Sequence, residues 1–176
     1  SGGASALTLS IYVAFFDEAG YGESWIGVLR MLTALGVVLV SFPFGIVLKF
    51  VGTDRLAILA LIGTGVLIII TALMADIRLV WIPALVATGA GFGSLRALYP
   101  TMVAQSSSQG QRAVALATVG VFWASGMWII PFVFGLLASS IGIGESMMVA
   151  GIILVAFGLI TPLLFQMWPP RQIEED

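Results

Sequence analysis

Five long apolar segments, almost free of charged residues, dominate this sequence of 176 residues. Each is at least 20 residues long; they are 24–48, 56–75, 79–104, 113–139 and 146–168. A helix rises about 1.5 Å per residue and the hydrocarbon core of a bilayer is about 30 Å thick, so each segment can cross a membrane. Because segments of this kind are stable only in lipid, we predict an integral membrane protein with an all-α fold.

A shorter apolar segment, 4–16, precedes these five. It would form about 20 Å of helix, too little for a complete span, and it lacks the basic flank of a signal peptide. We expect either the end of a spanning helix whose beginning lies outside this sequence or a helix that begins in the polar interface. The chain is then a fragment or half of something longer. The predicted fold is a single transmembrane bundle of about six helices, the first short or truncated, followed by a tail, 169–176.

The composition excludes several classes of function. The chain is 60% hydrophobic and 9% charged, far from the composition of soluble enzymes. It has no histidine and no cysteine, which argues against metals or haem bound through those residues and against a cysteine nucleophile. A net charge of −2 with no basic stripe argues against nucleic acid. Since no span holds paired carboxylates, we predict no enzymatic activity, no metal and no cofactor.

The basic residues indicate an orientation. Alternate connections between the segments, together with the tail, hold four of them: Lys49, Arg55, Arg112 and Arg171. The opposite set of connections holds Arg78 only. Cytoplasmic loops carry the excess of lysine and arginine, so we expect the C-terminus in the cytoplasm and the protein in the inner membrane of a bacterium.

Tryptophans near segment ends, Trp25, Trp81 and Trp168, are typical of interfacial anchors. Trp123 and Trp128 lie deeper in their segment, where we expect packing or a cavity wall rather than contact with a cofactor.

The connection between the long segments 24–48 and 56–75, read from Gly45 onward, is Gly45-Ile-Val-Leu-Lys49-Phe-Val-Gly52-Thr-Asp54-Arg55. It resembles the signature loop of the major facilitator superfamily, G-x-x-x-D-R/K-x-G-R/K-R/K. Gly45, Gly52 and Arg55 match, whereas Lys49 replaces the aspartate and Asp54 occupies a basic position. Such degraded copies are common in C-terminal halves of that superfamily. Gly45 would allow two helices to approach closely, and Gly52 would permit a positive φ.

The next part of the chain continues this resemblance. Gly89 and Gly93 form a GxxxG face that allows close packing of helix backbones, and Pro100 ends the glycine-rich stretch. A polar loop and a helix containing Pro131 follow, in the order found in the superfamily. The resemblance covers essentially the whole chain. It implies one six-helix half of a transporter, and the short tail favours the C-terminal half.

Two arginines, Arg30 and Arg96, lie inside apolar segments. A buried arginine is costly, so it usually faces a cavity, a partner or a polar pathway. The superfamily resemblance places Arg96 on a helix that lines the central cavity, where it would bind an anionic substrate or act as a gate, and Arg30 could do the same from the outer side. The alternative is that each snorkels to a headgroup or pairs with an acid. Further candidate substrate contacts are Ser94, Tyr99, Thr118 and Ser125.

Two functions remain open from the sequence. The first is a membrane transporter, or half of one, that moves a small solute by alternating access, the solute being anionic if the arginines bind it. It requires a second six-helix half as partner. The alternative is a non-transporting subunit that acts as a scaffold or assembly factor with other membrane subunits. The lipid bilayer is a partner in both cases.

Overall fold

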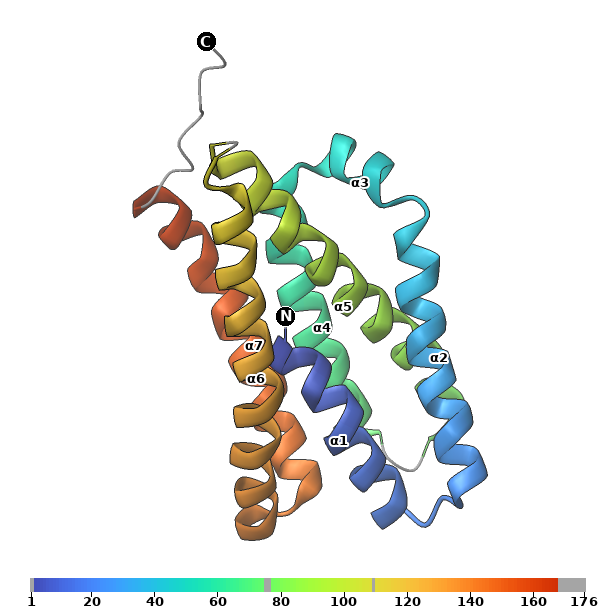
Figure 1. The fold of residues 1–176 in the computed structure, drawn as a ribbon. Helices are drawn as coiled ribbons and strands as arrows, with labels where there is room; N and C mark the ends of the chain where they lie inside the picture. The colour runs from blue at the N-terminus through green and yellow to red at the C-terminus, as the bar shows by residue number, and fades with distance from the viewer. Residues whose placement is uncertain (1, 75–76, 109, 168–176) are drawn as a thin grey trace.

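The computed structural model describes residues 2–74, 77–108 and 110–167, and all the secondary structure in these ranges is helical (Figure 1). The helices are α1 (Gly2–Glu18), α2 (Glu23–Ser41), α3 (Phe44–Val51), α4 (Thr53–Leu73), α5 (Arg78–Ser106), α6 (Arg112–Ile141) and α7 (Ile143–Met167). The predicted all-α bundle is therefore confirmed. The tail 169–176 and Trp168 lie outside the described residues.

The second apolar segment, 24–48, is not one continuous span. The helix α2 ends at Ser41, and Pro43 immediately precedes α3. Proline has no backbone N–H to donate the next hydrogen bond of the helix, and its ring crowds the preceding turn. The Pro43 carbonyl instead accepts the first hydrogen bond of α3, from the Val47 N–H at 2.9 Å. The chain turns here, so α3 runs across the end of the bundle and the fold has seven described helices (Figure 1).

Four helices in the described part of the chain, α2, α4, α6 and α7, are long and apolar enough to cross a membrane. The expected span 79–104 lies within α5, which is not among the four, and α1 has 17 residues. Both helices nevertheless lie within the bundle (Figure 1). Their crossing of the membrane stays a prediction.

Glycines bring two helix pairs into close contact. The helix α4 packs along α7, and α2 packs along α5. A Cβ atom added at Gly65 of α4 would lie 2.6 Å from the Gly151 carbonyl oxygen of α7. Lipid offers no hydrophobic force that drives helices together, so close backbone packing of this kind is what stabilises the pairs.

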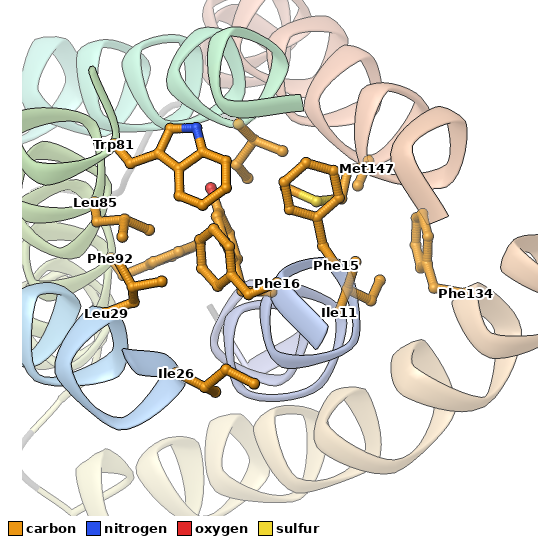
Figure 2. Close-up of a cluster of buried hydrophobic side chains, with 13 residues drawn as sticks. Ile11, Phe15, Phe16, Ile26, Leu29, Trp81, Leu85, Phe92, Phe134 and Met147 are labelled. Atoms are coloured by element: carbon orange, nitrogen blue, oxygen red, sulfur yellow. The ribbon is translucent and has the colours of Figure 1, made fainter. Parts of the chain in front are cut away.

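A buried aromatic cluster joins α1 to the beginning of α5. The ring of Trp81 lies 4.6 Å from that of Phe16 and 4.9 Å from that of Tyr21, measured between centroids. The Trp81 Nε1–H donates a hydrogen bond to the Met74 carbonyl oxygen at 2.9 Å. Trp81 is only 1% exposed, so it is a core residue rather than an exposed interfacial anchor (Figure 2).

Gly52 separates α3 from α4 with φ +81° and ψ 157°, a conformation essentially restricted to glycine. We expect Gly52→Ala to lower the free energy of unfolding by about 1–3 kcal/mol, because alanine is strained there. Gly45→Ala is the matched control, since Gly45 is helical and an added Cβ would meet nothing within 4 Å. Thermal unfolding in detergent, followed by circular dichroism, measures both. Equal losses in the two variants would contradict the prediction.

Candidate functional site: the cavity at Arg30

The contact between α2 and α5 is built on three glycines. A Cβ atom at Gly36 would overlap the Val86 carbonyl oxygen, and one at Gly89 would overlap the Thr33 carbonyl oxygen. At Gly93 it would lie 3.1 Å from the Cα of Val37. The face of α2 that holds residues 33, 36 and 37 is thereby fixed against α5, and this sets the direction of the neighbouring positions of α2.

A cavity of about 480 Å³ lies beside this contact, between α1, α2 and α5. Tyr12 and Phe16 come from α1, and Leu85 and Phe92 come from α5. The segment of α2 contributes Gly27, Leu29, Arg30, Met31, Thr33, Ala34 and Val37. Figure 2 shows the aromatic ring of Phe16 among Leu29, Leu85 and Phe92, the buried residues that back the cavity. The volume is typical of a site for a small organic molecule.

Among the described residues that line this cavity, Arg30 alone carries a charge. Its side chain is exposed, and it makes no hydrogen bond or ion pair with any residue that the structure describes. Pairing with Asp17, Glu18 or Glu23, the alternative considered from the sequence, is therefore not found among the described residues. The cavity presents one unpaired guanidinium, which can donate two parallel hydrogen bonds to a carboxylate or phosphate.

The rest of the cavity wall offers few polar groups. The Thr33 hydroxyl donates to the Leu29 carbonyl oxygen at 3.4 Å, and the Tyr12 hydroxyl is buried without a hydrogen bond of good geometry to a described residue. The other lining residues are aliphatic or aromatic, apart from Gly27. Such a wall suits an apolar body better than a sugar, whose many hydroxyl groups each need a partner.

A family model described as Major Facilitator Superfamily matches residues 1–175, nearly the whole chain. The chain belongs to the Major Facilitator Superfamily. The predicted resemblance is therefore confirmed, and the protein is an integral membrane protein of a superfamily whose members are generally transporters. No curated protein and no solved structure matches the chain.

Of the two expectations for glycines of the superfamily signature loop, the structure agrees with one and not with the other. Gly52 adopts the expected positive φ. Gly45, by contrast, lies inside α3, where an added Cβ would meet no neighbouring atom within 4 Å. The close helix approach expected at Gly45 is not found, because the break at Pro43 turns this residue away from the bundle. Lys49 in α3, and Asp54 and Arg55 at the start of α4, are all exposed.

The other candidate contacts do not converge on the cavity at Arg30. Arg96 is exposed on α5, forms no ion pair with a described residue, and is not among the lining residues of the described cavities. Ser94 is buried on the same helix. Thr118 and Ser125 are exposed on α6, and the Thr118 hydroxyl donates to the Val114 carbonyl oxygen at 2.9 Å.

Tyr99 lines a second, more apolar cavity of about 430 Å³ between α4, α5, α6 and α7. Thr161 also lines it, and its hydroxyl donates to the Phe157 carbonyl oxygen at 2.7 Å. None of the described lining residues of this cavity is charged. In this superfamily member, then, Arg30 and Tyr99 belong to different cavities, and only that of Arg30 can hold an anion by direct charge pairing.

Sequence reasoning missed the aromatic members of the cavity at Arg30, namely Tyr12, Phe16 and Phe92. No local pattern marks them, because phenylalanine and tyrosine are common throughout spanning helices. Among the residues that the structure describes, no group of histidine, cysteine, aspartate and glutamate could hold a metal ion.

Proposed function

We propose that the chain is the C-terminal six-helix half of a transporter that moves a small organic anion across the membrane by alternating access. Membership of a superfamily of transporters supports the general function. The observation that carries the substrate class is the cavity of about 480 Å³ in which Arg30 is the one charged residue of the described lining. An anion with an apolar body fits this lining, since Phe16, Leu29 and Phe92 replace water around the body while Arg30 binds the charge.

Alternating access needs a second half. Superfamily transporters of this kind work by rocking two repeats about a site between them. Large apolar side chains on α2 and α6 are exposed in this half, among them Met31 at 64% and Trp128 at 82%. Packing of Trp128 within the chain, one of the two roles expected from the sequence, is therefore not found. A second six-helix half, as another chain or as a further part of the same protein, would share these faces with lipid.

Arg30→Gln is expected to weaken binding of an aromatic carboxylate such as 1-naphthoate by about 10- to 100-fold, because a hydrogen bond to a charged group contributes about 1.5–3 kcal/mol. Arg30→Lys keeps the charge and loses the bidentate geometry, so its affinity for naphthoate should lie between those of the parent and of Arg30→Gln. Arg96→Gln is the matched control, an exposed arginine on α5 that does not line the cavity. Titration calorimetry with the purified protein in detergent measures the affinities.

Neutral 1-naphthamide and cationic 1-naphthylmethylammonium complete the test. Equal affinity for all three compounds, or equal losses in Arg30→Gln and Arg96→Gln, would contradict the assignment of an anion to this cavity. Two further measurements test transport separately: native mass spectrometry of the gently solubilised protein identifies its companion chains, and proteoliposomes are assayed for naphthoate uptake. A companion with a second set of six helices, together with uptake, would support the transporter. A larger assembly without such a companion and without uptake would favour the scaffold.

A further inference from the structure

The short helix α3 has two apolar faces, and the residues that the structure describes cover only one of them. Its inner face packs against a small cluster formed by Leu56 and Ala57 of α4 and Leu98 of α5. The residues on this inner face follow helical spacing: Phe44, Val47, Leu48 and Val51. They cover one end of α4 and α5, and this contact holds α3 across the end of the bundle (Figure 1).

The outer face of α3 carries large apolar side chains that no described residue covers. Ile46 is 63% exposed and Phe50 is 83% exposed, and Phe42, four residues before Ile46 at the end of α2, is 84% exposed. A spacing of four residues puts Ile46 and Phe50 in one row along α3, and Phe42 lies in the turn just before this helix. Lys49 is exposed beside the row, and Arg55 is exposed in the first turn of α4.

The position of α3 decides what faces this row. The helix connects α2 to α4, both long and apolar enough to cross a membrane, and it runs across their ends (Figure 1). It therefore lies at the level of a membrane surface. Helices in such a position bury their apolar side chains at the boundary between headgroups and acyl chains, while lysine and arginine extend to the phosphates.

We propose that α3 is an in-plane membrane helix that binds anionic phospholipid. Phe42, Ile46 and Phe50 insert between the lipids of the leaflet on this side, and Lys49 and Arg55 bind the phosphate groups. The exposed acid Asp54 offsets one of the two positive charges. Arg112 of α6 begins a helix at the same end of the bundle, and its Nη2 donates to the Ala104 carbonyl oxygen at 2.9 Å (Figure 1). Among the described residues at this end of the bundle, positive charge therefore outweighs negative charge.

The chain contains no cysteine, so single cysteines can report the depth of α3 in the membrane. Nitroxide labels at Ile46→Cys and Phe50→Cys are compared with one at Ser108→Cys, a control in the exposed connection before α6. The protein is reconstituted in vesicles of phosphatidylcholine with phosphatidylglycerol. Collisions with oxygen and with a water-soluble nickel chelate are measured by power saturation. We expect oxygen to dominate at positions 46 and 50 and nickel to dominate at position 108.

Either of two results at these positions would contradict the proposal that α3 inserts into the membrane. Nickel accessibility at 46 and 50 equal to that at 108 would place the row in water. Protection from both reagents would mean that another protein surface covers it, such as a second half of the transporter.

A second measurement addresses the headgroups. Spin-labelled phosphatidylglycerol and phosphatidylcholine are compared as partners of the intact protein, and the ratio of their association constants is taken. We expect Lys49→Gln and Arg55→Gln each to lower this ratio by up to about fivefold, and Asp54→Asn to raise it. All three side chains are exposed, so these changes should leave the fold intact. An unchanged ratio in all three variants would overturn the assignment of anionic lipid.

Discussion

Gly36→Ala is expected to separate α2 from α5 and to lower the free energy of unfolding by about 3 kcal/mol or more. The added methyl group would overlap the Val86 carbonyl oxygen and lie 2.8 Å from the Ala90 nitrogen. Both atoms belong to the backbone of α5, so no side-chain rotation can relieve the overlap. The two helices must move apart along their whole contact, which forfeits the close packing that stabilises helix pairs in lipid.

Gly63→Ala provides the matched control for this substitution. Gly63 lies inside α4, and an added Cβ there would meet no atom within 4 Å. Alanine favours a helix over glycine by about 1 kcal/mol, so this variant should be as stable as the parent or more stable. Circular dichroism during thermal unfolding in detergent measures both. If Gly36→Ala unfolds at the same temperature as Gly63→Ala, the close contact between α2 and α5 does not exist as described.

The same substitution tests how the cavity depends on packing. Arg30 and Thr33 belong to α2, and the contact that Gly36 makes possible holds this helix in place against α5. Separation of the helices would widen the cavity and withdraw Phe92 of α5 from the ligand. We therefore expect Gly36→Ala to lose naphthoate binding even at temperatures where the helices remain folded.

Trp81→Ala should produce the second large loss of stability. Truncating a buried tryptophan leaves a void, and in protein cores this costs about 3–5 kcal/mol. Here the void would open between Phe16 of α1 and the beginning of α5. The Met74 carbonyl oxygen would also lose the hydrogen bond that it accepts from the indole N–H. Because α1 forms one wall of the cavity at Arg30, its displacement should weaken ligand binding as well.

Trp128→Ala is the control for this second prediction, since Trp128 is 82% exposed and its removal opens no void in the chain. Trp81→Phe keeps a six-membered aromatic ring but loses the indole hydrogen bond, worth about 1 kcal/mol, and the volume of the five-membered ring, so its stability should lie between those of Trp81→Ala and the parent. Denaturation with increasing sodium dodecyl sulfate compares the three variants. Equal stability of Trp81→Ala and Trp128→Ala would show that the aromatic cluster does not join α1 to α5.

Much of the fold could be predicted because the membrane restricts the choice of structure. A backbone in lipid must satisfy its own hydrogen bonds, so a long apolar segment has to be a helix. The segments 56–75, 113–139 and 146–168 correspond closely to α4, α6 and α7. The close packing at Gly89 and Gly93 also follows from the sequence, since small residues four apart leave a groove that a neighbouring helix can enter.

The break after α2 could not be predicted from its proline alone. Pro43 ends a helix, whereas Pro83, Pro100, Pro131 and Pro162 lie within continuous helices. Prolines are tolerated in membrane helices where neighbours satisfy the freed backbone groups. At Pro43 the chain instead turns, and the inner face of α3 finds contacts on α4 and α5. That choice depends on surfaces distant in the sequence.

An all-helical membrane protein of the Major Facilitator Superfamily could be predicted from the residues alone, because hydrophobic length and loop motifs are local properties of the chain. The sequence also identified Arg30 and Arg96 as unusual charges in apolar segments. Their surroundings, however, became distinct only in the folded chain. Arg30 lines a cavity because the glycine contact between α2 and α5 fixes its direction, whereas Arg96 lines none of the described cavities. A side chain's surroundings depend on how helices rotate and pack against one another, and no single helix encodes that rotation.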